Sequence, residues 1–557
     1  MKTLHHLIFW LLALSSAAQD SYSKILQEEL TREFEILSKE DPPVYYMDYR
    51  YQLKNSWRAN ASFGKIVSAI NVKNGDAFVQ LRVGSPEFDN FHEVSQRSMR
   101  PFVLPEAVTY NPSAESLAQT FWQKTMEQYA FTGSQYLQKK NLIQQEEQES
   151  IADFSPADAQ VYYEDPIPAM SPADFEKVQT LIANASKAFK GVPHLKFGNV
   201  AFNYNLDRKY FFSSDEQSIV QNYRFARIIV TCALRTEEGD EVYQSKIFDG
   251  FSPKALPEQA ELDEAVQSLI DKVQQLREAP KAEPYAGPAV LSADAAGVFF
   301  HEILGHRIEG HRLRQKINAQ TFKKKLGEQV LPKTLSVIFD PEMSIYEGQD
   351  LNGYYQYDDQ GVKGKKVSII ENGILQSFLM SRTPVPGIDQ SNGHGRGDIR
   401  NHPVSRQSVM QISTSKPMEE DKLISMLKKE CKKQKLEYGY YIANVTGGYT
   451  TTHRYSPNAF NVAPTEVYKV FVDDRPNQLV RGVNLIGTPL AMFSTIEAAG
   501  DRSAVFNGFC GAESGSVPVS AIAPMILATK IETQKKVEKS STGPLLPDPM
   551  LVSNPNN

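Results

Sequence analysis

Residues 297–311 read Gly-Val-Phe-Phe-His-Glu-Ile-Leu-Gly-His-Arg-Ile-Glu-Gly-His, and the interpretation of the chain starts from this stretch. Three of the ten histidines of the chain lie in it, at His301, His306 and His311. Imidazole nitrogen is a good zinc ligand, and a carboxylate beside the first histidine, at Glu302, can take a proton from a metal-activated water. The stretch therefore indicates a candidate metal centre.

The spacing of the first two histidines predicts an irregular helix. The apolar periodicity predicts a helix at about residues 293–313. Each residue of a regular helix turns by about 100°, so residues five apart lie roughly 140° apart around the axis. His301 and His306 can face one ion only if the helix contains a π-bulge or is broken. Gly305, which lacks a side chain, permits either distortion.

Two histidines do not complete a catalytic zinc site, which usually has three protein ligands and one water. Within the helix, Glu309 and His311 are candidates for the third ligand. Elsewhere in the chain the candidates are Cys510, His394, His402 and His453. Thiolate binds zinc strongly, and metal binding protects an isolated cysteine from oxidation, which favours Cys510.

The segments around this stretch predict an α+β protein. Residues 279–288 contain three prolines, which neither a helix nor a central strand accommodates, so we place a domain boundary there. Before it, helical patterns alternate with strand patterns, the helices at 22–39, 113–141, 171–187 and 257–277 and the strands at 44–110 and 197–250. After it the chain is strand-rich, with one further helix near 417–436.

Two Asn-Gly dipeptides predict tight hairpin turns, because both residue types tolerate a positive φ. One is Asn74-Gly75 and the other is Asn372-Gly373. The first predicts an antiparallel meander within residues 44–110. The second predicts a hairpin within the strand-rich part of the chain.

The first residues predict export from the cytoplasm. Met1-Lys2 precedes an apolar run at residues 7–14, and Ser16-Ala17-Ala18 supplies the small residues that a signal peptidase requires. The run is far shorter than the ~20 residues that cross a bilayer, and no later segment is long and apolar enough. We expect cleavage after Ala18 and a periplasmic or extracellular product without a membrane span.

Composition excludes several classes of protein. The chain has 557 residues, with 60 Lys and Arg against 66 Asp and Glu and a net charge of −6. This balance lacks the clustered positive charge of a nucleic-acid binder. The three cysteines, Cys232, Cys431 and Cys510, are too few for a disulfide framework.

Together these features predict four segments. Residues 1–18 form the signal peptide, and residues 19–284 form an N-terminal α+β domain of antiparallel sheet with helices. Residues 285–534 form a strand-rich C-terminal domain that carries the candidate metal helix. Residues 535–557, which are polar and rich in Ser, Pro and Asn, form a flexible tail.

The motifs of the C-terminal half resemble those of the TldD/PmbA metallopeptidases, historically called modulators of DNA gyrase. The resemblance covers most of the chain and is strongest from about 285 to 530. Its marks are His301-Glu302-Ile303-Leu304-Gly305-His306, Glu309-Gly310, Asp358-Asp359-Gln360-Gly361-Val362, Ile370-Glu371-Asn372-Gly373-Ile374-Leu375, Arg481-Gly482-Val483, Cys510-Gly511 and Ser516-Val517-Pro518-Val519-Ser520.

The resemblance implies a zinc ion, Zn²⁺, held by His301, His306 and Cys510, with Glu302 as the catalytic base. It further implies a two-domain α+β protomer, a C-terminal metallopeptidase domain and a dimer. The family contains zinc-bearing TldD-like subunits and PmbA-like partners without the motif, and this chain resembles the zinc-bearing kind. Because it carries an export signal, the partner is either a second copy or a related subunit, and the gyrase name does not transfer.

The expected function is hydrolysis of peptide bonds in peptides or unfolded segments by a zinc metallopeptidase. The alternative is a non-catalytic peptide-binding or scaffold subunit, whose structural zinc would have Glu309 or His311 as a fourth ligand. A hydrolase of non-peptide amides would use the same chemistry. Glu309 and His311 are otherwise expected to support the ligands, and His394 and Arg396, in a Gly-rich loop, are candidates for substrate contact.

Overall fold

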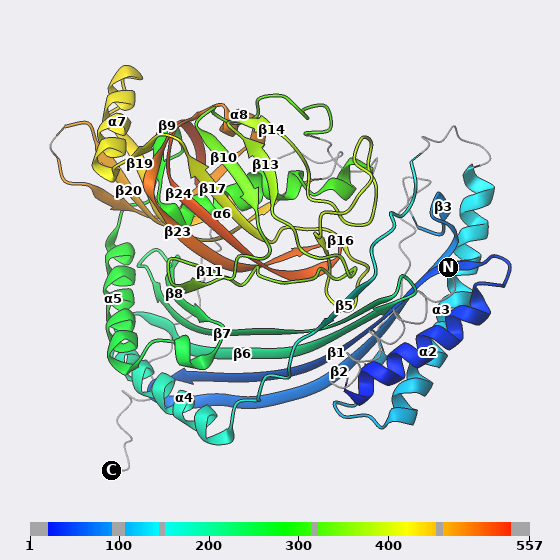
Figure 1. Cartoon of the computed structure of the whole chain (residues 1–557). Coiled ribbons are helices and arrows are strands. Elements are labelled where there is room, and N and C mark those ends of the chain that lie inside the picture. The colour runs from blue at the N-terminus through cyan, green and yellow to red at the C-terminus, as the bar shows by residue number, and fades with distance from the viewer. Residues whose placement is uncertain are drawn as a thin grey trace, which may run out of the picture.

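The computed structural model of the chain describes residues 20–91, 106–143, 151–314, 321–452, 460–473 and 475–535. In it, a long curved sheet lies beneath a second, strand-rich body that contains residues 285–535 (Figure 1). The predicted signal peptide, His453 and residues 536–557 lie outside the described ranges. Within those ranges, no helix has the length and apolar character needed to span a membrane.

The first sheet has eight strands and is almost wholly antiparallel. Its path is β3-β2-β1-β6-β7-β5, with β4 on β2 and β8 on β7, and only β5 pairs in parallel. The strands are β1 (Val44–Ser62), β2 (Lys65–Ser85), β3 (Phe88–Asp89), β4 (Glu106–Val108), β5 (Gln160–Tyr163), β6 (Leu195–Ser213), β7 (Gln217–Arg235) and β8 (Glu241–Gly250).

Four helices cover one face of this sheet, because alternate residues of its strands are apolar. Tyr49 and Tyr51 of β1 pack against α2 and α3, while Trp57 packs in the cluster of α4 and α5. The helices are α2 (Ser21–Leu37), α3 (Ala114–Ile143), α4 (Pro172–Ala185) and α5 (Gln259–Glu278). The other face carries polar residues such as Arg50 and Gln52 and lies toward the second body.

The first hairpin turn does not lie where the sequence predicted it. β1 and β2 are joined at Phe63-Gly64, both with positive φ, and Asn74-Gly75 lies inside β2, opposite Leu53 and Lys54. A side chain on Gly75 would lie 3.1 Å from the carbonyl oxygen of Val108, so this glycine allows β4 to approach. The prediction at Asn372-Gly373 is confirmed, because this pair joins β13 to β14.

The second sheet has twelve strands, and part of it closes on itself. Its path is β14-β13-β10-β17-β24-β22-β20-β19-β9, and β9 also pairs with β24, so that β9, β19, β20, β22 and β24 form a closed ring. The strands are β9 (Tyr285–Leu291), β10 (Leu335–Phe339), β13 (Val367–Glu371), β14 (Ile374–Leu375), β17 (Val409–Thr414), β18 (Pro417–Met418), β19 (Tyr438–Thr450), β20 (Phe460–Phe471), β21 (Gln478–Val480), β22 (Val483–Gly487), β23 (Ile496–Ala512) and β24 (Gly515–Lys535).

Shorter elements complete this half of the chain. The helices are α6 (Ala293–Ile303), α7 (Glu420–Lys433) and α8 (Pro489–Phe493). Two small two-stranded pairs lie in the loops, formed by β11 (Ile345–Tyr346) with β12 (Gln349–Asp350) and by β15 (Gly395–Arg396) with β16 (Val404–Ser405). The predicted α+β class is confirmed, with helices on an antiparallel N-terminal sheet and a strand-rich C-terminal half.

The proline-rich segment is partly strand, which corrects the expectation that no central strand accommodates it. Residues 285–291 form β9, which lies between β19 and β24. Pro288 is tolerated because the ladder with β24 is interrupted there, between the pairs of Ala528 and Ile531. A proline has no N–H to donate, so it fits a strand only at such an irregularity.

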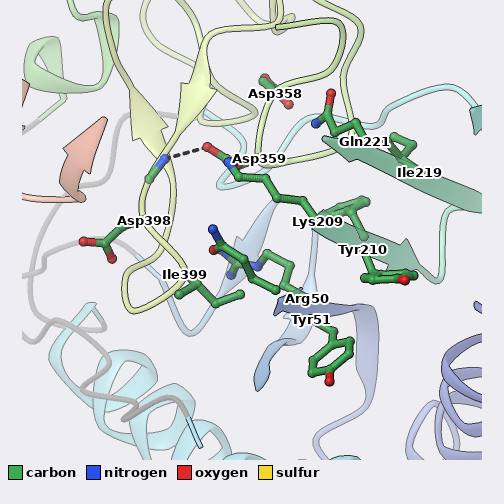
Figure 2. A pocket seen from close by; sticks show the side chains of 13 residues that line it. Arg50, Tyr51, Lys209, Tyr210, Ile219, Gln221, Asp358, Asp359, Asp398 and Ile399 are labelled. Carbon is green, nitrogen blue, oxygen red and sulfur yellow. Dashed lines mark hydrogen bonds and ion pairs between the residues drawn. The ribbon is translucent and has the colours of Figure 1, made fainter. Parts of the chain in front are cut away.

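Polar contacts join the two sheets. Lys209 of β6 forms an ion pair of 3.1 Å with Asp359, and Arg227 of β7 donates to the carbonyl oxygen of Asn507 in β23 at 2.9 Å. Buried Arg382 donates to the carbonyl oxygen of Ser155 at 2.9 Å. Figure 2 shows the pocket in this interface, which is lined by residues of β1, β6 and β7 and of the loops around Asp358 and Asp398, and where Lys209 reaches toward Asp359.

Candidate metal centre

Helix α6 places the first histidine in the interior. Ser292 caps its N-terminus, because its Oγ accepts from the N–H of Ala295 at 3.1 Å and donates to the carbonyl oxygen of Ala443 in β19 at 2.8 Å. Every residue from 295 to 303 is buried, and the helix packs against β19, β23 and β24. His301 therefore projects from a rigid, enclosed helix.

The predicted interruption of the helix is confirmed, and it is a break and not a π-bulge. Helix α6 ends at Ile303, and Gly305–Arg307 form a short 3₁₀ turn that carries His306. Gly305 leaves room for the amide of Gln407, because a Cβ atom at this position would lie 2.0 Å from Oε1 and the buried amide would have to move. The change from α-helix to 3₁₀ turn reorients His306, so the two histidines need not follow regular helical spacing.

The fold brings His301, His306 and Cys510 together. One ligand atom from each lies within 4.8 Å of the other two, and all three residues are less than a tenth exposed. The Sγ of Cys510 lies 3.3 Å from Nε2 of His306, and the imidazole rings lie 5.1 Å apart between centroids. Tetrahedral zinc with bonds of 2.0–2.3 Å separates its ligand atoms by about 3.5 Å, so these donors could hold a metal ion.

A β-hairpin delivers Cys510 to this cluster. Cys510 lies near the end of β23, opposite Val517 of β24, and the hairpin turns between Ala512 and Gly515. Val517 and Val519 pack with Cys510 in a small apolar cluster. The thiol is thus held on a rigid element although it is 204 residues from His306 in sequence.

The charges of the cluster favour the ligand form of the thiol. Burial raises the pKa of Cys510, but the rings of His306 and His301 outweigh burial and hold that pKa well below its usual value. Thiolate, and not thiol, is the form that binds metal. Burial lowers the pKa of His306, but Cys510 and Glu309 outweigh it and raise that pKa well above its usual value.

Glu302 lies beside the cluster and is also buried. Among the described residues its Oε2 atom has no hydrogen-bond partner. Burial raises the pKa of this carboxyl, and His301 and His306 oppose the shift. Gly448 of β19 makes room for it, since a Cβ atom there would lie 2.7 Å from Cγ of Glu302. A buried carboxylate with a free oxygen is suited to exchanging protons.

Glu309 and His311 take different positions around the cluster. Glu309 is completely buried, and its Oε2 lies 3.3 Å from Nδ1 of His306 and 2.9 Å from Nε of Arg312. Burial raises the pKa of Glu309, but His306 and Arg312 outweigh it and lower the pKa to about 2. His311 bonds to Glu513 through Nε2. Glu309 thus supports His306 directly, whereas His311 bonds to the hairpin turn.

The side chains of His394 and Arg396, the candidates for substrate contact, lie in the interior, and a substrate contact by either residue stays a prediction. Nε2 of His394 lies 3.0 Å from Oγ of Ser408, and the side chain is completely buried. Arg396 lies in β15 and donates to the carbonyl oxygen of Pro518 at 2.7 Å. Neither residue is among the cluster of metal donors. His394 contacts Ser408 and Arg396 donates to the carbonyl oxygen of Gln407, so both hold the segment that precedes β17.

His402, the remaining described candidate for the third ligand, lies away from the cluster. Its Nδ1 is 3.1 Å from Oε1 of Gln80, and its ring meets Phe78 edge to face. It belongs to the contact between the first sheet and the loop after β15. His402 therefore does not join His301 and His306.

Sequence reasoning did not single out residues 405–408, Ser-Arg-Gln-Ser, which are almost completely buried. Arg406 donates to the carbonyl oxygen of Cys510, and the amide of Gln407 donates to the carbonyl oxygen of His301 at 3.4 Å. Ser408 contacts His394. The only local signal was a polar run before the apolar strand β17, which is also typical of a surface loop.

Comparison with known proteins was consistent with this geometry. Residues 284–535 match the family model described as the PmbA/TldA metallopeptidase C-terminal domain. A metalloprotease from Methanocaldococcus jannaschii is 32% identical over 231 residues, which are 41% of this chain and 47% of that protein. A zinc metalloprotease TldD homolog from Saccharolobus solfataricus is 24% identical over 370 residues, 64% of this chain and 75% of that protein.

The chain spans about half the length of several of the curated relatives that it matches. Two solved structures share the fold over nearly their whole length. TldE from Thermococcus kodakarensis has a TM-score of 0.61 at 15% identity and covers 91% of this chain and 100% of its own. A protein from Thermotoga maritima, described as a modulator of DNA gyrase, has a TM-score of 0.59 at 14% identity, with coverage of 91% and 99%.

Proposed function

Because this chain belongs to the TldD/PmbA family, we propose that it is a zinc-dependent metallopeptidase that hydrolyses peptide bonds in peptides or unfolded segments. The observation that carries the proposal is the buried cluster of His301, His306 and Cys510 with Glu302 beside it. Relatives named as metalloproteases support a metallopeptidase-family role. The assignment of zinc, substrate and residue roles to this chain is our proposal.

The donor set fits zinc. Two imidazoles and one thiolate are ligands that zinc prefers, and zinc sites built for catalysis use three protein ligands. A closed structural site would need a fourth, for which Glu309 or His311 was the candidate. Glu309 is engaged by His306 and Arg312, and His311 by Glu513, which supports an open fourth position.

Zinc bound by these residues would polarise the scissile carbonyl and acidify a water molecule. The chain's own contribution is the proton chemistry of Glu302. Its carboxylate accepts the proton of the attacking water and then delivers that proton to the nitrogen of the leaving amine. Burial of the site keeps bulk water from competing for both transfers.

The proposal also includes location and assembly. We propose that residues 1–18 are removed during export and that the mature chain acts outside the cytoplasm. We further propose that it works as a homodimer or with a related subunit. The mass of the exported chain tests whether residues 1–18 are removed. The molar mass of the purified protein in solution tests whether it is a dimer.

The test of the proposed activity measures zinc content and peptide cleavage on residues 19–557. Wild type and Glu302→Gln should each contain about one zinc per chain, whereas Cys510→Ser should contain much less. Wild type should cleave a library of unstructured peptides, and Glu302→Gln should be slower by about 10²–10⁴-fold. Cleavage by Glu302→Gln at the wild-type rate would refute the assigned base. Folded wild type without zinc would refute the metallopeptidase proposal.

A further inference from the structure

Glu309 connects the turn that carries His306 to two arginines. Its side chain is completely buried, and Oε2 accepts from Nε of Arg312 at 2.9 Å while it faces Nδ1 of His306 at 3.3 Å. A proton held on Nδ1 leaves Nε2 as the lone-pair nitrogen of the ring. It is Nε2 of His306 that lies 3.3 Å from the Sγ of Cys510. Glu309 therefore holds the ring of His306 with Nδ1 toward itself and Nε2 toward Cys510.

Arg406 extends this connection to the hairpin of Cys510. Its Nε lies 3.4 Å from Oε1 of Glu309, and its side chain is completely buried. Nη2 donates to the carbonyl oxygen of Cys510 at 2.5 Å. Nη1 donates to Oγ of Ser514 at 2.9 Å and to the carbonyl oxygen of Gly515 at 3.0 Å. The guanidinium of Arg406 thus donates hydrogen bonds both to Cys510 and to the turn that follows it.

Glu309 and Arg406 together connect two segments that belong to different elements of the fold. His306 lies on the turn after α6, and Cys510 lies near the end of β23. Arginine is suited to this position because its five donors have a fixed planar geometry, whereas lysine offers a point charge on a flexible stem. Because Arg406 is buried, moving Glu309 away leaves this guanidinium without its nearest carboxylate, whereas Glu309 keeps its pair with Arg312 when Arg406 moves. The link is thus a buried ion pair, without a hydrogen bond between Nε of Arg406 and Oε1 of Glu309, and hydrogen bonds fix it to the Cys510 hairpin on the Arg406 side.

We propose that Glu309 and Arg406 are positioning residues that together set the separation and orientation of His306 and Cys510 for a metal ion. The inference rests on the proposed metal centre and concerns how the chain prepares it. Neither side chain is required to touch the metal or the substrate. Their effect acts through the two ligands.

The experiment compares Glu309→Gln and Arg406→Lys with a matched control, Arg382→Lys. Arg382 is equally buried, but it donates to Ser155 and pairs with Asp215 in the interface between the sheets. Zinc affinity is measured by competition with a chromogenic chelator. The absorption spectrum of the cobalt-substituted protein reports the thiolate and imidazole geometry. Urea unfolding of each variant reports stability.

We expect Glu309→Gln and Arg406→Lys each to weaken zinc binding by about 10–100-fold and to shift the cobalt bands. Arg382→Lys should lose stability yet keep wild-type affinity and spectrum. The double variant should lose less than the product of the two single effects, because both substitutions break one link. If Arg406→Lys does not fold, Glu309→Gln alone carries the comparison.

The outcomes separate this inference from the proposed function. Wild-type affinity and spectra in both variants would overturn the positioning role and leave the metallopeptidase proposal intact. The same would follow if Arg382→Lys weakened zinc binding as much as the other two, since general destabilisation would then explain the loss. Failure of wild type to bind zinc or cobalt would instead overturn the proposed function.

Discussion

At the scale of single residues, the space beside Glu302 is set by a glycine of β19. A Cβ atom on Gly448 would lie 2.7 Å from Cγ of Glu302 and 2.8 Å from the carbonyl oxygen of Asn461. Contacts this short cannot be tolerated, so either the carboxylate or the strand must move. The position of the proposed base is therefore determined by the absence of a side chain on a neighbouring strand.

Gly448→Ala should lower kcat for peptide cleavage by about tenfold or more, because a displacement near 1 Å at a reacting group can cost up to 10²-fold. Zinc content should not change, since the three atoms nearest to a Cβ at this position belong to Glu302 and Asn461 and not to the three proposed ligands. Gly511→Ala is the control: it is adjacent to Cys510, and a Cβ atom there meets nothing within 4 Å. Equal activity of the two variants would contradict this account.

At the scale of elements, the end of α6 depends on a second close approach. Gly305→Ala would place a Cβ atom 2.0 Å from Oε1 of Gln407, whose amide also contacts the carbonyl oxygen of His301. Overpacking of this kind costs about 1–3 kcal/mol of unfolding free energy. We expect Gly305→Ala to lower that free energy and the urea midpoint.

Gly133, inside α3, is the matched control, at which alanine should raise the unfolding free energy and not lower it. A Cβ atom there meets nothing within 4 Å, so Gly133→Ala should raise the unfolding free energy by about 0.5–1 kcal/mol through helix propensity. Urea unfolding of both alanine variants checks the pair. Stabilisation by Gly305→Ala would show that the turn tolerates a side chain and would contradict the tight packing of Gln407.

The β15–β16 segment should make stability depend on pH. Burial lowers the pKa of His394 to about 3, against about 6.5 in an unfolded chain. Burial likewise holds the pKa of His402 well below its usual value. Between those values the unfolded chain binds a proton that the folded chain does not, so acid favours unfolding. The stabilising effect is complete above pH 6.5 and declines by about 1.4 kcal/mol per pH unit per histidine below it.

Urea unfolding at pH 7.5, 6.5 and 5.5 tests this dependence. The informative quantity is the difference between wild type and His394→Gln, because burial raises the pKa of Asp358 to about 7 and that carboxyl changes stability in the opposite direction over the same range. His394→Gln should be less stable than wild type at pH 7.5 but should lose less between pH 6.5 and 5.5, because one of the two buried histidines is gone. An identical loss in both proteins would contradict the assignment to His394.

At the scale of the whole molecule, the two sheets meet through hydrogen bonds and ion pairs. Arg227 pairs with Asp249 and also donates to Asn507, three residues before Cys510. Lys209 pairs with Asp359, which in turn accepts from the N–H of Gly397 at 3.1 Å (Figure 2). Separating the sheets would break the hydrogen bond from Arg227 to Asn507 and the ion pair of Lys209 with Asp359, although Arg227 would keep Asp249 and Asp359 would keep Gly397.

We therefore expect the two sheets to unfold together. The described tryptophans, Trp57 and Trp122, both lie in the half of the chain with the first sheet, so their fluorescence reports that half. Absorption of cobalt bound at the candidate centre would report the other half. Coincident urea midpoints from the two signals are expected of one cooperative unit, whereas separated midpoints would show that the interface does not couple the sheets.

Local patterns predicted the elements well where the determinant was local. Apolar periodicity placed the helices within a few residues of α2, α3, α4, α5 and α7, because each buries one stripe. The break after α6 was predictable because five-residue spacing does not suit a regular helix. The prediction of a turn at Asn74-Gly75 was wrong. Turn propensity is a local preference, and the pairing of β1 along the whole length of β2 outweighs it.

The sequence by itself determined the α+β class, the candidate ligands and the place where the helix must break, since these follow from residue chemistry and short-range spacing. Only the tertiary structure decided that Cys510, and not His394 or His402, meets His301 and His306. It also revealed Arg406, whose role depends on Glu309 and on a hairpin about a hundred residues further along the chain. The physical reason is that long-range strand pairing sets these distances, and no local pattern specifies which distant strands will pair.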